Sequence, residues 1–165
     1  MSEPPGDVVV STPAQHRALA HPLRHRILMA LGAGPATLSQ LARTLDVRKG
    51  SVAHHLGVLQ EAGMVTPGER RPVRGGTEQY FERRVRRIVG PDDPATAAAL
   101  LGAVAQEIAT APADPLLHVR TLRLTRAAAR ELRATLDRLV GELAEAGPRS
   151  PRHTVVVSLF ERSSS

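Results

Sequence analysis

Apolar residues in the first 62 positions recur at intervals of three and four, the period of helices that bury one face. Two of these helices begin with a Thr-x-x-Gln capping box, at Thr12–Gln15 and Thr37–Gln40, and Pro22 opens another. A fourth helix is expected at Lys49–Ala62, after a short turn at Asp46–Val47. The pattern therefore predicts four short helices, the last two closely joined.

A β-hairpin is expected directly after the fourth helix. Residues 64–67 and 77–82 each have the pattern of a strand, and the segment between them holds Pro72, Gly75 and Gly76, which favour a turn. The same segment carries three arginines: Arg70, Arg71 and Arg74. The hairpin is therefore expected to present a positive tip.

The chain beyond the hairpin predicts a helix, a strand, a long helix and a last strand. They are expected at Thr96–Thr110, Leu116–Leu124, Thr125–Ala146 and His153–Phe160, after a helix-start signal at Pro91–Pro94. Apolar residues in the long helix are spaced by 3, 4, 3, 4 and 3, a heptad seam. They are Ala129, Leu132, Leu136, Leu139, Leu143 and Ala146. Periodicity leaves open whether the seam is an intrachain core stripe or a dimer contact.

Charge is unevenly distributed along the 165 residues. The formal net charge is +6, but residues 13–87 hold 13 basic and 5 acidic residues, a net of +8, and the remainder holds 9 and 11, a net of −2. All but one of the 22 basic residues are arginine, whose planar guanidinium suits phosphates and guanine edges. This asymmetry is typical of a DNA-reading segment on a neutral body, and an ordinary solvated surface is the alternative.

Three segments in order resemble the winged helix-turn-helix of the ArsR-type family of bacterial transcriptional repressors. They are AHPLRHRILMAL, TLSQLARTLDVRKGSVAHHLGVLQEAGMV and VRGGTEQYF, and the resemblance covers roughly residues 14–87. It implies a mainly α fold with a small β part. The expected organisation is a disordered arm at 1–11, a winged helix-turn-helix DNA-binding domain at 12–90, and C-terminal helices and strands at 91–165 for dimerisation or effector binding.

The second helix of a helix-turn-helix approaches base edges with its N-terminal part. The residues expected there are Arg48, Lys49, Gly50, Ser51, Ala53, His54 and His55. The resemblance aligns Lys49, Gly50, Ser51, Ala53 and His54 with the contact positions of the family. Gly50 and Ala53 depart from its pattern, where small hydroxyl residues are frequent, and would give close approach or methyl contact instead. Thr37 and Gln40, at the start of the preceding helix, are also expected to contact DNA.

The hairpin arginines Arg70, Arg71 and Arg74 suit the minor groove or its flanking phosphates, with an exposed charged turn as the alternative. Four further arginines follow the second strand and are weighed as an extension of the phosphate contacts. They are Arg83, Arg84, Arg86 and Arg87.

The histidines allow more than one interpretation. His54 is a candidate DNA contact, whereas His55, beside the apolar Leu56, is favoured as a packing residue. His21 and His25 are one helical turn apart and could pair on a metal, but no third ligand lies near them in the sequence. His118 and His153 fall on the two C-terminal strands and are expected to be structural. No metal and no cofactor are predicted.

Several protein classes are disfavoured by what the sequence lacks. It has no cysteine, which excludes disulfides, a thiolate nucleophile and thiol metal sites, and no apolar run long enough to cross a bilayer. Its three aromatic residues, Tyr80, Phe81 and Phe160, are too few for stacking on single strands. No catalytic motif is present, so an enzyme is not expected. A bacterial cytoplasmic protein associated with the nucleoid is expected.

The function predicted from these features is a sequence-specific double-stranded DNA-binding transcriptional regulator, a homodimeric repressor at an inverted-repeat operator. Its dimer contacts are expected within Thr12–Ala20 and Thr125–Ala146. The residues concerned are Leu19, Leu132, Leu136, Leu139 and Leu143. The alternative is a winged-helix module for protein–protein contact or chromosome scaffolding. A small-molecule effector enclosed by the C-terminal helices is a third possibility.

Overall fold

The computed structural model describes residues 6–9, 12–89, 93–112, 115–144, 146–147 and 150–162. The chain divides into two compact units, residues 1–115 and 116–165, here called the head and the tail unit. The division falls at Pro115, whereas the sequence predicts a boundary at about residue 90.

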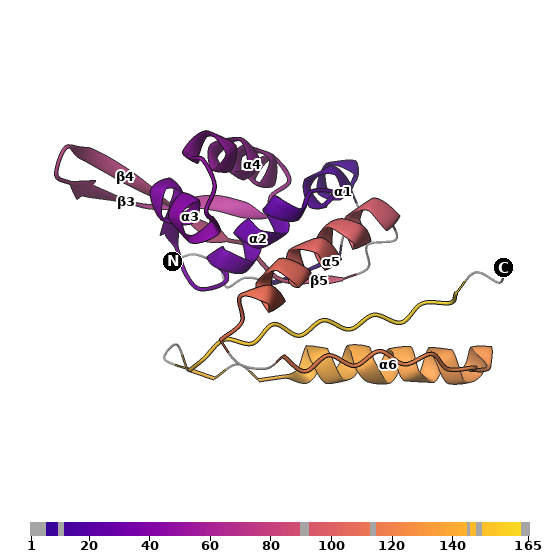
Figure 1. The fold of residues 1–165 in the computed structure, drawn as a ribbon. Helices are drawn as coiled ribbons and strands as arrows, with labels where there is room; N and C mark the ends of the chain where they lie inside the picture. The colour runs from indigo at the N-terminus through magenta and orange to yellow at the C-terminus, as the bar shows by residue number, and fades with distance from the viewer. Residues whose placement is uncertain are drawn as a thin grey trace. The chain divides into compact units, whose positions relative to one another are not determined.

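Five helices form most of the described head (Figure 1). They are α1 (Pro13–Leu19), α2 (Pro22–Leu31), α3 (Leu38–Leu45), α4 (Lys49–Glu61) and α5 (Pro94–Ala109). Both capping boxes are present: the Thr12 hydroxyl accepts from Gln15 N at 3.2 Å, and the Thr37 hydroxyl accepts from Gln40 N at 3.2 Å. The predicted helix starts are therefore confirmed where a local cap specifies them.

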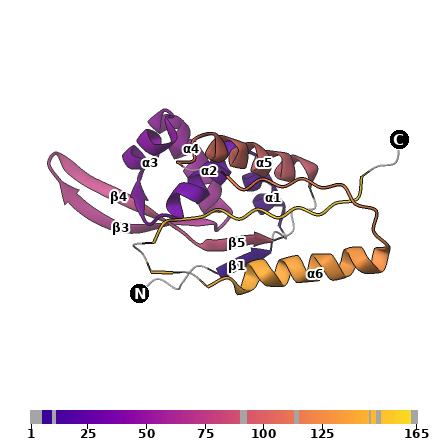
Figure 2. The ribbon, with the colours of Figure 1, turned by 60° about the horizontal axis from the view of Figure 1, so that its bottom comes forward.

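A three-stranded antiparallel sheet follows the helices in the order β2-β4-β3. Its strands are β2 (Ala36–Thr37), β3 (Val65–Val73) and β4 (Gly76–Arg83). The hairpin is longer than expected, because pairing resumes beyond a bulge after Pro67 and continues to Val73 opposite Gly76. Gly75 has a φ of 100°, a conformation that glycine adopts without a steric penalty. The hairpin projects from the body beside α3 (Figures 1 and 2).

A second, parallel pair joins β1 (Gly6–Val9) to β5 (Val85–Val89) (Figure 2). The prediction of a disordered arm is therefore wrong for residues 6–9, because β5 provides them with a hydrogen-bonding partner nearly 80 residues along the chain. Residues 1–5, 10 and 11, also part of that prediction, lie outside the described residues, as do residues 163–165.

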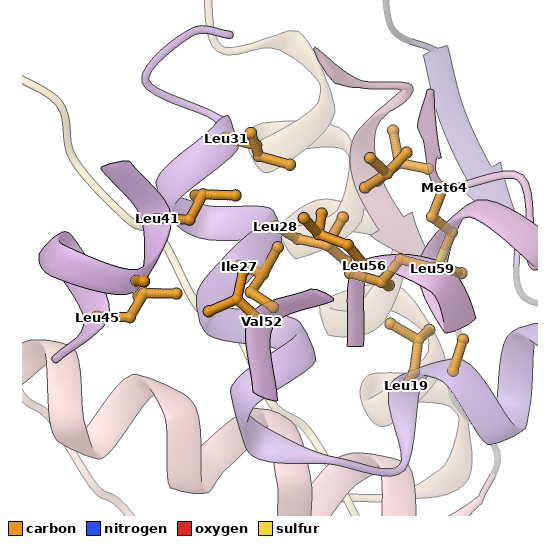
Figure 3. Packing of buried hydrophobic residues seen from close by; sticks show 14 residues of the cluster. Leu19, Ile27, Leu28, Leu31, Leu41, Leu45, Val52, Leu56, Leu59 and Met64 are labelled. Carbon is orange, nitrogen blue, oxygen red and sulfur yellow. The ribbon is translucent and has the colours of Figure 1, made fainter. Parts of the chain in front are cut away.

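The core of the head lies where α2, α3 and α4 meet (Figure 3). Ile27 and Leu28 of α2 pack in one cluster with Val52, Leu56 and Leu59 of α4, and all five are at most 2% exposed. This burial is the main stabilising term, since each such side chain contributes about 1.5–3 kcal/mol.

Leu19, predicted as a dimer contact, belongs to this cluster. Its side chain is 0% exposed and packs inside the head, so it is not available to a partner. Leu19 was expected at a dimer contact as part of the helix Thr12–Ala20, but its side chain is turned inward.

Helix α5 is part of the head because its small-residue face is buried there. Thr96 and Ala103 are 0% exposed, and α5 packs on α1 and α2. Asp93 caps the helix, accepting from Thr96 N at 2.9 Å and from the Thr96 hydroxyl at 2.7 Å, and these bonds lower the pKa of the Asp93 carboxyl. Because α5 packs in the head, the boundary between the two units lies after α5 and not at about residue 90.

The described part of the tail unit contains one helix, α6 (Arg126–Glu142), capped by the Thr125 hydroxyl. It ends before the predicted end at Ala146, because Leu143 is already extended. The strands predicted at 116–124 and 153–160 are absent: both segments are extended but pair with no other strand in the described chain. No described residue of the tail unit is buried. The prediction was wrong for the single chain, because a strand needs a neighbouring strand that this chain does not supply.

The two capping boxes allow a matched test of how local and tertiary contacts share the stability of the head. Replacement Thr37→Ala should lower the free energy of unfolding by about 1–2 kcal/mol, because Thr37 is 2% exposed and also pairs with β4, whereas Thr12→Ala at the exposed box should cost about 0.5–1 kcal/mol. Chemical denaturation of both variants measures the difference. Equal losses would contradict a tertiary contribution at Thr37.

Candidate nucleic-acid interface

The last two helices of the head core form a tight pair. Asp46 ends α3 in the left-handed conformation with a φ of 53°, and Arg48 precedes α4 as an extended N-cap residue. Both helices bury one face, α3 through Leu41 and Leu45 and α4 through the residues described above. The opposite face of α4 is therefore left for solvent or a partner.

The N-terminal part of α4 is exposed and positively charged. Arg48, Lys49, Gly50, Ala53 and His54 are exposed, and Ser51 is half-buried. A side chain added at Gly50 would meet nothing within 4 Å, so the backbone of this first turn is open to close approach. The structure thus places six of the seven predicted α4 residues at an accessible surface.

Of the two predicted contacts at the start of α3, Thr37 is buried and Gln40 is exposed. The Thr37 hydroxyl is buried, and the Gln40 side-chain oxygen accepts from Thr37 N at 2.8 Å. Both side chains therefore fix the start of α3. Gln40 itself is exposed, so of the two only its side chain lies at the surface.

His55 lies beneath the exposed face of α4. Its ring centroid is 4.4 Å from that of His21 and 5.1 Å from that of His54, and the residue is 9% exposed. The His21 Nδ1 atom accepts from Leu23 N at 3.1 Å and caps α2, which requires that nitrogen to be unprotonated. The three rings thus connect the start of α2 to α4.

Burial is the largest cause that lowers the pKa of His55 to about 4, and the neighbouring His21, Arg24 and His54 contribute in the same direction. Burial and Arg24 also lower the pKa of His21. His55 is therefore neutral at physiological pH and acts as a packing residue, in agreement with the favoured interpretation of the sequence.

Two of the three hairpin arginines, Arg70 and Arg71, are held by other residues of the hairpin. Arg71 forms an ion pair with Glu69 at 2.8 Å and lies 4.8 Å from the ring centroid of Tyr80, and the bond to Glu69 raises the pKa of the guanidinium. Arg70 Nε donates to the Gln79 side-chain oxygen at 2.8 Å. Arg74 lies exposed at the turn. All three predicted cations are thus presented on one ordered hairpin.

Gln79 has a role that the sequence did not reveal. Its amide nitrogen donates to Gly68 O at 2.9 Å and to Tyr80 O at 2.7 Å, which spans the bulge in β3. A Cβ at Gly68 would come within 2.6 Å of the Glu82 carboxylate, so a side chain there would displace the Glu82 side chain. The bulge and its amide set the direction of Arg70.

Other arginines hold the head together. Arg83 donates to Leu28 O and Val85 O, which removes it from the expected phosphate contacts. Arg84 is exposed, and the side chains of Arg86 and Arg87 lie outside the described part of the structure. Arg26 donates to Leu45 O at 3.1 Å and links α2 to the end of α3. No local sequence signal indicates such long-range bonds.

The described residues contain no group of three His, Asp or Glu side chains placed to hold a metal ion. His25 is 2% exposed and its Nε2 atom bonds Leu19 O at 2.8 Å, so the His21–His25 pair serves the backbone. His118 and His153 are exposed. Within the described part of the chain, no helix is long and apolar enough to span a membrane.

Residues 19–67, from the end of α1 to the start of β3, match the family model described as a helix-turn-helix domain. A curated relative, the biofilm growth-associated repressor of Agrobacterium fabrum (strain C58), is 39% identical over 49 residues. These residues are 30% of this chain and 42% of the relative, so the chain spans about two fifths of the relative's length.

Solved structures are also similar to the chain. A possible transcriptional regulator for arsenical resistance is 25% identical and matches over 81% of this chain and 100% of its own, with a TM-score of 0.37. The transcriptional repressor BigR from Xylella fastidiosa is 20% identical over 59% of this chain and 84% of its own, also with a TM-score of 0.37.

The buried His55 predicts that stability falls on acidification. Above its ordinary pKa of about 6.5 both folded and unfolded forms are neutral, whereas between about 6.5 and 4 only the unfolded chain takes the proton. From pH 7 to pH 5 this group should cost up to about 2 kcal/mol of unfolding free energy. His55→Phe, which keeps a ring against His21, should flatten that dependence in denaturation measured at both pH values.

The matched control is His54→Gln, at the exposed neighbouring position. It should retain the full pH dependence. A His55→Phe variant with an unchanged slope would show that His55 is not the titrating group.

Proposed function

We propose that this chain, a transcriptional regulator with a winged helix-turn-helix domain of the ArsR type, binds a specific double-stranded operator as a homodimer and represses transcription. Its match to a helix-turn-helix model indicates regulation of genes rather than catalysis. Its place of action would be the bacterial nucleoid in the cytoplasm.

The observation that carries the proposal is the exposed, cationic first turn of α4 on a helix whose other face is locked in the core. Lys49 and Arg48 are exposed there, and Val52, one residue after Ser51, is 0% exposed. A helix held in this way can enter a major groove without rearranging the head. Long-range attraction would come from the net +8 of residues 13–87.

Each exposed residue of α4 suits a particular contact. Lys49 and Arg48 can donate to guanine O6 and N7, and the Ser51 hydroxyl can reach a phosphate or a base. Gly50 leaves the helix backbone open, and the Ala53 methyl suits a thymine methyl. His54 is exposed beside them, whereas the buried His55 and Thr37 would support the surface from beneath.

The hairpin would act as the wing beside the reading helix. Arg70 and Arg71 are already held by Gln79 and Glu69, so little side-chain entropy remains to be lost on binding. Arg74 at the turn would reach the minor groove or its phosphates.

Two copies of the head are needed for useful affinity, because one reading helix contacts only a few base pairs. A two-fold pair engages half-sites about one helical turn apart, which predicts an inverted repeat. Of the seam leucines, Leu139 and Leu143 are 59% and 54% exposed and so remain candidate dimer contacts, while Leu132 and Leu136 are half-buried.

Replacement Lys49→Ala should lower operator affinity by about 10- to 100-fold, because a good base contact is worth ~1–3 kcal/mol. The duplex would be selected from genomic fragments by the purified protein and is expected to contain an inverted repeat. Fluorescence anisotropy would measure affinity, with Arg17→Ala, an exposed cation of α1, as the charge-matched control. Equal losses in the two variants would indicate non-specific attraction and favour a protein-contact or scaffolding module.

The wing makes a separate prediction about salt. A triple Ala variant at Arg70, Arg71 and Arg74 should bind all duplexes more weakly, and its slope of log affinity against log salt should fall by ~0.9 for each phosphate that the wing no longer neutralises. Titration at several salt concentrations measures the slope. A slope equal to that of the unaltered protein would remove the wing from the DNA contacts.

A further inference from the structure

The tail unit has no core of its own. Of the 13 large hydrophobic residues that are exposed in the described chain, 11 lie between Leu116 and Phe160. Leu116 is 87% exposed, Val119 90% and Phe160 74%. A unit that exposes this much apolar surface and buries none of its described residues is not a finished folded structure.

The backbone of the tail unit is also unfinished. Residues 116–124 and 153–160 are extended and run lengthwise along α6, yet neither belongs to a sheet (Figures 1 and 2). A strand, a helix and a second strand in the same direction form the order of a βαβ unit, whose strands lie in one sheet. Val155, Val156 and Val157 have the β-branched side chains that such strands favour.

Apolar residues occupy both faces of the first segment. Leu117 and Val119 point to one side of an extended chain and Leu122 and Leu124 to the other. Each face also carries an arginine, Arg123 on one and Arg120 on the other, so these apolar positions favour a sheet that is covered in part. The exposure of Leu122 and Leu124 is lower, at 47% and 42%, but still large.

We propose that the tail unit is completed by the tail unit of a second copy of this chain. Residues 116–124 and 153–160 of one copy pair through their backbones with the same segments of its partner, and the two α6 helices cover the joint sheet. The inference rests on the proposed homodimer and assigns its joint to the tail unit.

A second copy is the occupant that the surfaces favour. The described head exposes only two large hydrophobic residues, Val73 on the wing and Leu101 on α5, so it offers no apolar face of matching size. The tail unit does offer one. Its 11 exposed residues leave uncovered the equivalent of about six to seven whole side chains, or roughly 400–800 Å² of apolar area. One partner in a standard interface buries ~800 Å² in total, somewhat over half of it apolar.

The charges of α6 favour a two-fold arrangement. Its first half is mainly basic, with Arg126, Arg130 and Arg133, and its second half carries Asp137 and Glu142, while Glu131 and Arg138 are the exceptions. Antiparallel helices would place each basic half near the acidic half of the partner, and their dipoles would also oppose.

The test uses the full chain at a series of concentrations without DNA. Sedimentation should give twice the chain mass of 17.7 kDa, and amide exchange within residues 117–124 and 153–160 should be slow in the dimer and at least 100-fold faster on dilution to monomer. Protection of these amides in the monomer would overturn the proposal, because the head of the same chain would then cover them.

A paired substitution locates the joint. Val155→Lys together with Val157→Lys should raise the dimer dissociation constant at least 100-fold, because two charges enter the shared sheet. Leu101→Lys, at a residue of similar exposure on α5, should leave it unchanged. If Leu101→Lys raised the dissociation constant and the double lysine variant did not, the dimer contact would lie on the head and the proposal would be refuted.

Cross-linking of single-cysteine variants provides a second test, which does not depend on the folding of the double lysine variant. The chain contains no cysteine, so a single one placed in turn at residues 154–159 and 118–123 reports only its own surroundings. Oxidation should link two chains through at least one position in these segments and through none at Leu101→Cys. The absence of any such link would also overturn the proposal.

Binding to a single half-site separates this inference from the proposed function. If the double lysine variant is monomeric and still binds a half-site as the unaltered head does, both proposals stand. If the unaltered protein is a tail-joined dimer that binds no duplex, only the DNA-reading proposal fails.

Discussion

Ile27 and Leu28 of α2 hold α4 in place through Val52, Leu56 and Leu59, and the surface chemistry of the head depends on this contact. Protein cores are packed as densely as organic crystals, so α4 cannot turn about its axis without opening voids. One face of α4 is fixed inward, and the face with Lys49 and His54 is fixed outward. The His21–His55 ring contact, at 4.4 Å between centroids, ties the start of α2 to the same helix.

The sequence predicted those parts of the head that are specified by near neighbours. Capping boxes at Thr12 and Thr37 set helix starts within three residues, and glycine at residue 75 set the turn of the wing. It could not predict bonds between distant residues. Arg83 is the last residue of β4 and, with Arg84, Arg86 and Arg87, was considered as a phosphate contact, yet it donates to Leu28 O, 55 residues away. The strand at residues 6–9 likewise exists only because β5 lies beside it.

Burial distinguishes residues for which the sequence predicts the same role. Leu19 and Leu139 are both expected at a dimer contact, but Leu19 is 0% exposed and Leu139 is 59% exposed. Spacing alone predicts the heptad seam, and its leucines differ in the same way: Leu136 of α6 is half-buried, whereas Leu143 is exposed and lies just beyond the helix, which ends at Glu142. Apolar spacing predicts which face of a helix is buried. It does not show whether the same chain or a partner chain buries that face.

A joint in the tail unit would give the heads a specific kind of coupling. The sequence between α5 and the tail unit holds prolines at 112 and 115, and each proline fixes its own φ. Two heads joined in this way meet the second half-site at a high effective concentration, and the gain depends on whether the connection spans the two sites. If both proposals hold, the tail joint would set the spacing of the operator and α4 would set the bases read at each half-site. Evolution could thus change one without altering the other.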